Sequence, residues 1–229
     1  MELTVRDSAR LLKVSEKTIY RWIKTGKLPA YRVNEQYRLN RAELLEWATS
    51  QRVNVSVDIF AEPSNGTLHL GLLDALRAGG IHYRVSGCEK TEVLRSAVDL
   101  MPLPEEVDRE FLLKVLLARE SLGSTAVGDG IALPHVRNPV VMHVPRPMIT
   151  LCFLETPVPF GALDGKPVHT LFTMLSPTVR SHLQMLARLS FALRHPEFAT
   201  VISRQGTREE IWAACEAVDR VAGEPVAQA

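Results

Sequence analysis

The stretch Gly128-Asp129-Gly130-Ile131-Ala132-Leu133-Pro134-His135 is the part of this 229-residue chain that most strongly decides its fold. Its glycines let backbone N–H groups approach an anion closely, because glycine adopts conformations that other residues avoid. Ser124 and Thr125, just upstream, supply hydroxyl donors. The apolar residues predict a short strand and the proline stiffens its exit, so we expect His135 to be held in one place. A fixed, neutral imidazole beside such donors can accept a phosphoryl group on nitrogen.

Arg119 lies further upstream, and its guanidinium fork suits the oxygens of a phosphate. Catalysis of phosphoryl transfer is mostly positioning and charge stabilisation, so few other groups are required. We therefore predict His135 and Arg119 as catalytic residues. The candidate phosphate-binding residues are Ser124, Thr125, Gly128 and Gly130.

Other chemistries lack their sequence patterns. The chain has no dinucleotide fingerprint, no P-loop and no nucleophile elbow of the hydrolase type. The apolar run 111–118 is most simply a core helix. We expect neither a metal nor a cofactor, because metal-ligand spacing and a carboxylate cluster are both missing around His135, His143, His169 and His182. Five of the seven histidines, like most single histidines, are interpreted as surface or turn residues: His69, His82, His143, His169 and His195.

The composition is that of an ordinary globular protein. Hydrophobic residues make up 46% of the chain, and 27 Lys and Arg nearly balance 26 Asp and Glu. Three widely spaced cysteines cannot form a disulfide framework, which favours a reducing compartment. No secretory leader and no long apolar run appear in the sequence, so we expect a cytoplasmic protein without a membrane segment.

Charge divides the chain unevenly. Residues 1–50 hold ten Lys and Arg against six Asp and Glu, whereas 51–229 hold 17 against 20. A basic end of this kind hints at a nucleic-acid-binding segment. A cluster of turn formers at 62–67 indicates a linker. We predict a small domain at 1–50, a linker at 51–66 and a larger domain at 67–222.

Two helices and a tight turn are predicted at the N-terminus. Thr4 with Asp7 forms a capping box for a helix that reaches about Lys13, and Ser15 caps a second helix that stops near Gly26. The apolar residues of these helices, expected in the core, are Val5, Ala9, Leu12, Ile19, Trp22 and Ile23. The residues left facing outward on the second helix are Lys17, Thr18 and Arg21.

Two short strands are predicted next, over 28–33 and 37–39, around a polar turn at 34–36. Arg32 and Arg38 on this hairpin are candidate phosphate contacts. Asn40 with Glu43 then caps a last helix, which we expect to bury Leu44, Leu45 and Trp47.

The segment from Leu3 to Ala30, above all Val14 to Pro29, resembles the excisionase and MerR-like winged helix-turn-helix family. This resemblance implies DNA binding, with Lys17, Thr18 and Arg21 directed to the major groove. Proteins of this kind usually read two-fold sites, so we expect a homodimer. A departure is the wing turn, where the family often has glycine and this chain has Asn34-Glu35-Gln36. The alternative is a helical interaction module with a solvated basic face.

The segment from about Leu68 to Val221 resembles the enzyme IIA domain of the fructose, mannitol and nitrogen-regulatory branch of the bacterial phosphotransferase system. The motif from Gly128 to His135, preceded by Arg119-Glu120, carries the resemblance, with support from 159–168 and from Ser181-His182-Leu183. It implies an α/β fold, a mixed β-sheet flanked by helices. His135 matches the phosphorylated histidine, Arg119 the phosphate-pairing arginine and His182 the second active-site histidine. The chain departs from the family pattern at Ala126, Asp129 and Val136.

The resemblance also implies partners. An HPr-type phosphocarrier supplies the phosphoryl group in that family, and the fusion to a helix-turn-helix favours a regulator whose phosphorylation state controls DNA binding. Two alternatives stay open. The domain can pass its phosphoryl group to a IIB-type partner, or it can act as a docking module for kinases or transporters. A degenerate sensor that keeps the fold without being phosphorylated is a further interpretation.

Overall fold

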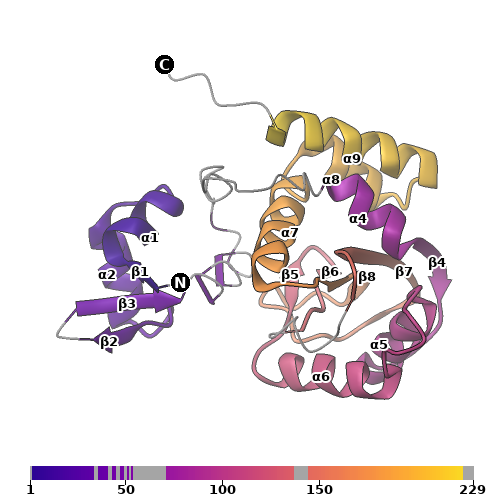
Figure 1. Cartoon of the computed structure of the whole chain (residues 1–229), viewed down its shortest axis with the longest axis horizontal. Coiled ribbons are helices and arrows are strands. Elements are labelled where there is room, and N and C mark those ends of the chain that lie inside the picture. Colours follow the sequence, from indigo (N-terminus) through magenta and orange to yellow (C-terminus); the bar gives the residue numbers. More distant parts are fainter. Residues whose placement is uncertain are drawn as a thin grey trace. The chain divides into compact units, whose positions relative to one another are not determined.

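The computed structural model describes residues 2–33, 36–40, 43–44, 47–48, 51, 53, 71–136 and 144–223. Its backbone divides into two compact units, residues 1–68 and 69–229 (Figure 1). Apart from Gln51 and Val53, the predicted linker at 51–66 lies outside the described residues.

The first unit combines two helices with a three-stranded antiparallel sheet. Its strands, in the order β1-β3-β2, are β1 (Glu2–Thr4), β2 (Tyr31–Val33) and β3 (Gln36–Asn40). The helices are α1 (Val5–Leu11) and α2 (Glu16–Lys24). Both predicted N-caps are confirmed: Thr4 forms a capping box with Asp7, and the Ser15 hydroxyl accepts the Thr18 N–H at 3.2 Å.

Several local boundaries differ from the prediction. α1 ends at Leu11 instead of about Lys13, because Lys13 adopts a left-handed φ of 52°. β2 starts at Tyr31, after Pro29, which has no N–H to donate to a ladder. Gln36, predicted in the turn, opens β3 and pairs with Val33. The sequence analysis also missed β1, a three-residue strand whose partner lies far along the chain.

The core of this unit forms mainly from the predicted apolar residues. Fully buried members include Leu12, Ile19, Leu39 and Leu44. Other residues predicted in the core are only half-buried, namely Trp22, Ile23 and Trp47, although the two indole rings pack 4.9 Å apart. Leu45 lies outside the described residues.

The second unit is a five-stranded mixed sheet between two layers of helices. The strands, in the order β4-β7-β8-β6-β5, are β4 (Ile81–Val85), β5 (Ala126–Gly128), β6 (Ile131–Ala132), β7 (Met148–Val158) and β8 (Val168–Leu175). β4 runs parallel to β7 and β6 parallel to β8, whereas the β7–β8 and β5–β6 pairs are antiparallel. The predicted fold class is confirmed.

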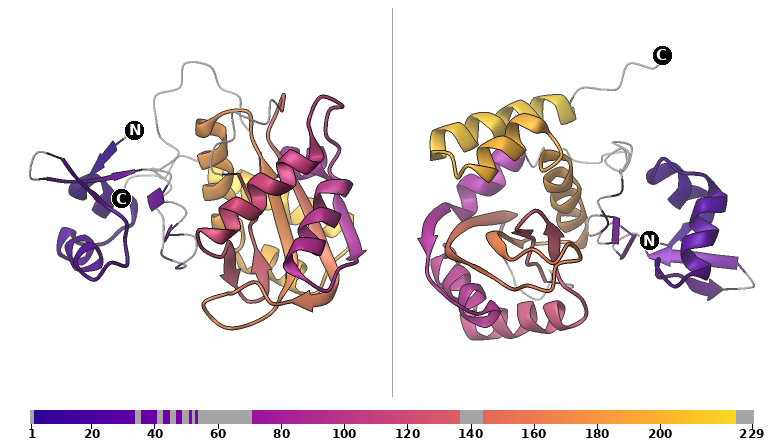
Figure 2. Two further views of the ribbon diagram at one scale, coloured as in Figure 1. Left: turned by 90° about the horizontal axis from the view of Figure 1, so that it is seen from below. Right: turned by 180° about the vertical axis from the view of Figure 1, so that it is seen from behind.

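Each face of this sheet carries its own apolar core. Helices cover both faces (Figure 2). One face packs against α5 (Lys90–Leu100) and α6 (Arg109–Ser121), which contains the predicted core helix at 111–118. The other face packs against α4 (Leu72–Gly79), α7 (Val179–Ala192), α8 (Pro196–Ser203) and α9 (Arg208–Gly223). Among the described residues, we find no helix with the length and apolar character needed to span a bilayer.

Two contacts fix α4 on the sheet. A Cβ at Gly79 would lie 2.3 Å from the backbone of Ile149, so the helix end meets β7 backbone to backbone. At its other end, the Asp219 carboxylate accepts the N–H groups of Leu72 and Leu73 at 2.9 and 3.0 Å. Asp219 also pairs with Arg188 at 3.0 Å, and thus joins α4, α7 and α9.

Candidate active site

His135 lies just beyond β6, beside the end of β8. The chain leaves β6 in extended form: the Met174 N–H donates to the Pro134 carbonyl at 2.9 Å, and His135 bridges Met174 in parallel register. The imidazole is 3% exposed, and its Nδ1 lies 2.7 Å from the Leu133 carbonyl oxygen. A carbonyl only accepts, so Nδ1 carries the proton, and the lone pair of the neutral ring is on Nε2.

His182 approaches His135 from the first turn of α7. Thr178 and Ser181 form a capping box there, and the His182 N–H begins the helical hydrogen bonds by donating to Thr178 O. The His182 ring is 2% exposed and its centroid is 5.2 Å from that of His135, at an angle of 46°. The structure thus brings together two buried histidines that stand far apart in the sequence.

Arg119 lies in the last turn of α6 and is half-buried. Its Nη1 donates to the Gly123 carbonyl at 3.0 Å, so the guanidinium closes the loop between α6 and β5. The pairing of Arg119 with a phosphoryl group on His135 stays a prediction.

The two predicted hydroxyl donors hold the same loop. The Ser124 hydroxyl donates to Phe160 O at 2.6 Å and accepts the Ala126 N–H at 3.1 Å. The Thr125 hydroxyl donates to the Glu120 carboxylate at 2.6 Å. Each hydroxyl has one proton, so both protons are committed to protein acceptors in this structure. A role of either hydroxyl in phosphate binding stays a prediction and requires the side chain to rotate.

Glu120 and Lys90 are structural residues of this loop that sequence reasoning did not assign. Glu120, 7% exposed, accepts both the N–H and the hydroxyl of Thr125. Lys90 donates to Glu120 at 3.1 Å and to the Phe160 carbonyl at 2.9 Å. The ion pair therefore anchors the loop to α5 and to the segment after β7. The only sequence signal was the position of Glu120 next to Arg119.

Gly128 and Gly130 form a tight hairpin turn between β5 and β6. Asp129 and Gly130 have φ values of 48° and 71°, as a two-residue type I′ turn requires, and Gly128 has a φ of 88°. A Cβ on Gly130 would lie 2.3 Å from the His169 ring. The turn accounts for both glycines, and their contact with a phosphate stays a prediction.

Asp129, the acidic departure from the family pattern, has a partner. Its carboxylate pairs with Lys166 at 3.0 Å, and more than half of each side chain is exposed. Its N–H donates to Asp164 at 2.8 Å, which lowers the pKa of that carboxyl. Lys166 offsets one of the two negative charges, those of Asp129 and Asp164, at this turn.

The predicted DNA contacts lie in the first unit. Lys17 and Arg21 are exposed on α2, whereas Thr18 is half-buried and its hydroxyl lies 3.0 Å from that of Ser15. Arg38, on β3, donates to the Gln36 amide oxygen at 3.1 Å. Arg32 belongs to β2, but its side chain lies outside the described residues.

Tyr20 is a surface residue of α2 that the sequence analysis did not single out. It is 42% exposed and meets Tyr37 edge-on, with ring centroids 6.1 Å apart. Its position beside Arg21 in the sequence was the available signal.

Comparison with known proteins finds a matching family for each of the two units. Residues 74–218 match the family described as phosphoenolpyruvate-dependent sugar phosphotransferase system, EIIA 2. The chain belongs to this family. Residues 2–52 match the helix-turn-helix domain family, so the EIIA 2 domain follows an N-terminal helix-turn-helix domain.

Relatives place the EIIA 2 domain among nitrogen regulatory proteins. The nitrogen regulatory protein of Pseudomonas aeruginosa is 35% identical over 141 residues, which is 60% of this chain and 89% of the relative. The crystal structure of nitrogen regulatory protein IIA-Ntr from Neisseria meningitidis matches with a TM-score of 0.52 and 28% identity, over 59% of this chain and 92% of that one. A fructose-specific EIIA component from Haloferax volcanii is 36% identical over 92 residues, or 39% of this chain and 58% of its own length.

Proposed function

We propose that the EIIA 2 domain accepts a phosphoryl group on Nε2 of His135 from an HPr-type phosphocarrier, and that the phosphorylation state of His135 regulates DNA binding by the helix-turn-helix domain. The observation that carries the proposal is the buried pair of His135 and His182, with the tautomer of His135 set by the Leu133 carbonyl.

The proposed reaction needs no proton to leave His135. The Nε2 lone pair attacks phosphorus while the bond between phosphorus and the donor histidine breaks, and the electron pair of that bond returns to the donor. Nδ1 keeps its proton, and the Leu133 carbonyl accepts it at 2.7 Å, which stabilises the positive charge that develops on the ring. Burial of the ring limits hydrolysis of the product.

The surroundings of His135 and His182 favour the negative charge of the phosphoryl group. A phosphoryl group adds about −1.5 to −2 charges at neutral pH. The first turn of α7, which carries His182, presents the positive end of a helix of 14 residues. In the proposal, His182 donates a hydrogen bond to a phosphoryl oxygen and Arg119 turns from Gly123 to pair with the group.

Phosphorylation is tested by incubating the full chain with enzyme I, an HPr-type carrier and phosphoenolpyruvate, followed by mass spectrometry under non-acidic conditions. We expect one acid-labile phosphoryl group on His135 and none in His135→Ala. His195→Gln is the matched control, because the His195 side chain forms no capping bond to α8. Equal labelling of wild type and His135→Ala contradicts the proposal.

The basic first unit supports DNA binding. Exposed Lys17 and Arg21 on α2 suit a helix that enters the major groove. We expect the full chain to bind a duplex selected from a random pool. Lys17→Ala should reduce the slope of log affinity against log salt by about 0.9 if Lys17 contacts a phosphate.

Regulation is tested with the same duplex and the full chain in both phosphorylation states. We expect a change in affinity of about fivefold or more, within the range of ordinary coupling energies. His135→Ala, treated with the same donors, should show no change. Equal affinities of the two states across a salt series contradict the regulatory part, whatever the labelling experiment gives.

A second candidate is a phosphocarrier that passes the group to a IIB-type partner. The similarity to the fructose-specific EIIA component of Haloferax volcanii favours it. A chase of radiolabelled phosphoryl groups from the phosphorylated chain to purified IIB-type proteins distinguishes the two. Failure of every acceptor to take the label contradicts this second candidate.

A further inference from the structure

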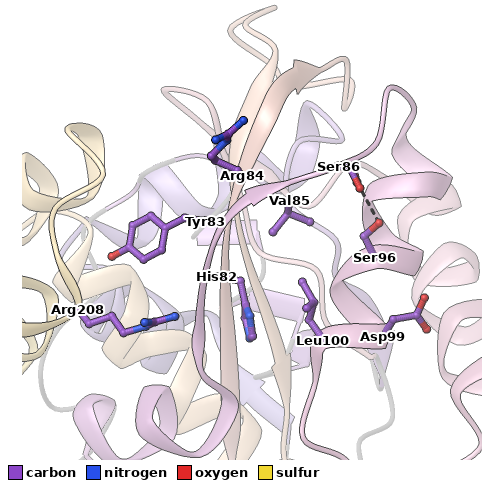
Figure 3. Close-up of a pocket in the computed structure, with 9 residues that line it drawn as sticks. All are labelled: His82, Tyr83, Arg84, Val85, Ser86, Ser96, Asp99, Leu100 and Arg208. Carbon is purple, nitrogen blue, oxygen red and sulfur yellow. Dashed lines mark hydrogen bonds between the residues drawn. The ribbon is translucent and has the colours of Figure 1, made fainter.

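A hollow of about 550 Å³ lies along the outer edge of β4 and is lined by β4, by the end of α5 and by Arg208 at the start of α9 (Figure 3). It does not involve His135 or His182, because β7 and β8 lie between β4 and β6 in the sheet. Its volume falls within the range of pockets that hold small ligands.

The Arg208 side chain is held in this hollow by contacts that use only part of its guanidinium. Nε and Nη2 donate to the Ile81 carbonyl at 3.3 and 3.0 Å, and the guanidinium carbon lies 5.8 Å from the centroid of the Tyr83 ring. These contacts use two of the five N–H groups. The N–H groups that remain on Nη1 and Nη2 can donate side by side to two oxygens of a ligand, as an end-on fork. Within the described parts of the chain, no carboxylate forms an ion pair with Arg208.

His82 is the second group with unused hydrogen-bonding capacity. Its Nε2 is buried and has no hydrogen-bond partner among the described residues, a costly arrangement for a polar atom. Figure 3 shows the Arg208 guanidinium extended toward His82. Burial, and then the charge of Arg208, lower the pKa of His82, so the ring is neutral near pH 7 and can donate one N–H.

The other charges of the hollow limit what it can hold. Arg84 pairs with Glu155 at 3.2 Å, and Asp99 projects from α5 on the other side of the strand (Figure 3). Asp99 also lines the hollow, so its negative charge opposes that of Arg208, and the hollow suits one oxyanion group at its Arg208 end and disfavours a ligand with several. Leu100, 39% exposed, adds an apolar wall.

We propose that this hollow is a binding site for a small ligand with a single oxyanion head, a carboxylate or a phosphate, that Arg208 and His82 hold while a short apolar body contacts Leu100. The end-on fork of Arg208 matches two oxygens of either head. The imidazole donates to one of them once its ring turns toward the hollow, because Nε2 is buried as the side chain stands. The site goes beyond the proposed phosphoryl transfer and does not depend on it.

The test is an NMR titration of the full chain with butyrate and, in a separate arm, with inorganic phosphate, at ionic strength held constant with chloride. We expect saturable shifts of the His82 ring and Arg208 side-chain signals. The anion that saturates the shifts at the lower concentration, butyrate or inorganic phosphate, shows whether the site prefers a carboxylate or a phosphate head. Loss of a charge-assisted hydrogen bond should weaken binding about tenfold or more in Arg208→Ala.

Two further variants make the test decisive. His82→Phe keeps the volume of the ring and leaves the bonds between Arg208 and Ile81 in place, but we expect it to lose affinity as well. Arg204→Ala, which removes a nearby arginine already paired with Glu210, should bind like wild type. Saturation by neither anion, or wild-type affinity in Arg208→Ala or in His82→Phe, overturns the proposal.

Discussion

The hydrogen bond from Nδ1 of His135 to the Leu133 carbonyl is the residue-scale feature from which the proposed chemistry follows. It assigns the proton to one nitrogen and the nucleophilic lone pair to the other. In the proposed mechanism, His182, whose ring centroid lies 5.2 Å from that of His135, acts on the transferred group and not on the attacking nitrogen.

Replacement of His182 should slow phosphorylation without moving it to another site. We expect His182→Ala to reduce the rate of phosphorylation by the HPr-type carrier about 100-fold, as loss of a donor to a developing anion does elsewhere. His182→Gln, which keeps an N–H donor, should recover part of the rate. Rapid-quench measurements at saturating donor provide the comparison, and a wild-type rate in His182→Ala rules out this role.

The three cysteines should differ sharply in reactivity. Cys88 is exposed, whereas burial raises the pKa of Cys152 and of Cys215 to about 12. Since the thiolate is the reactive form, we expect one reactive thiol per native chain at pH 8 and three after denaturation. Titration with a chromogenic disulfide reagent measures both numbers. Two or three fast-reacting thiols in the native chain would contradict the burial.

At the scale of elements, the loop between α6 and β5 depends on the ion pair of Lys90 and Glu120. The Glu120 side chain is 4% exposed and that of Lys90 30%. Lys90→Met leaves a buried carboxylate without its cation, so we expect a loss of about 3 kcal/mol in unfolding free energy. Urea denaturation measures it.

The double variant Lys90→Met/Glu120→Gln is the matched control for that prediction. It removes both charges, so its unfolding free energy should lie closer to wild type than that of Lys90→Met. If Lys90→Met stays within about 0.5 kcal/mol of wild type, the pair does not hold the loop.

The start of α9 should become less stable in acid. A hydrogen bond from Arg204, and then the Thr207 N–H, lower the pKa of Glu210 from 4.5 to about 2. A carboxyl whose folded pKa is depressed stabilises the fold above its unfolded pKa, and this stabilisation is lost as pH falls from 4.5 toward 2. Glu210→Gln should therefore be less stable than wild type at pH 7, with a difference that shrinks over this range.

Chemical denaturation at a series of pH values tests the Glu210 prediction, and Glu209→Gln is the control, because Glu209 is exposed on the same turn. A difference between wild type and Glu210→Gln that stays constant from pH 7 to pH 3 would show that Glu210 does not titrate as described.

Local signals made several elements predictable from the sequence. The capping box at Thr4 and the N-cap at Ser15 involve residues three positions apart, so a short stretch of sequence contains the whole interaction. The partners of Ser124 and Glu120 are different. Ser124 donates to a carbonyl 36 positions away, and Lys90 reaches Glu120 across 30, so only the folded chain shows that these groups already have partners.

At the scale of the whole molecule, the resemblance identified both units, and the turn formers at 62–67 predicted a linker between them. The structure separates residues 1–68 from 69–229, and the two families match 2–52 and 74–218. The predicted division at 1–50, 51–66 and 67–222 stays a prediction. The hollow at β4 was not predictable at all, because His82 and Arg208 are far apart in the sequence.

The proposed function requires energetic coupling between the two units of the molecule. It requires that the charge gained at His135 alters how the helix-turn-helix domain meets DNA, through differential binding energy in the two states. All of it rests on the phosphorylation of one nitrogen.

The most direct measurement of that central claim is a long-range proton–nitrogen NMR spectrum of the full chain, labelled with ¹⁵N histidine, before and after treatment with enzyme I, an HPr-type carrier and phosphoenolpyruvate. We predict that the phosphoryl group changes the Nε2 signal of His135, while Nδ1 keeps its proton and its bond to Leu133. A spectrum with phosphorylation on Nδ1, on another histidine or on none would contradict the account.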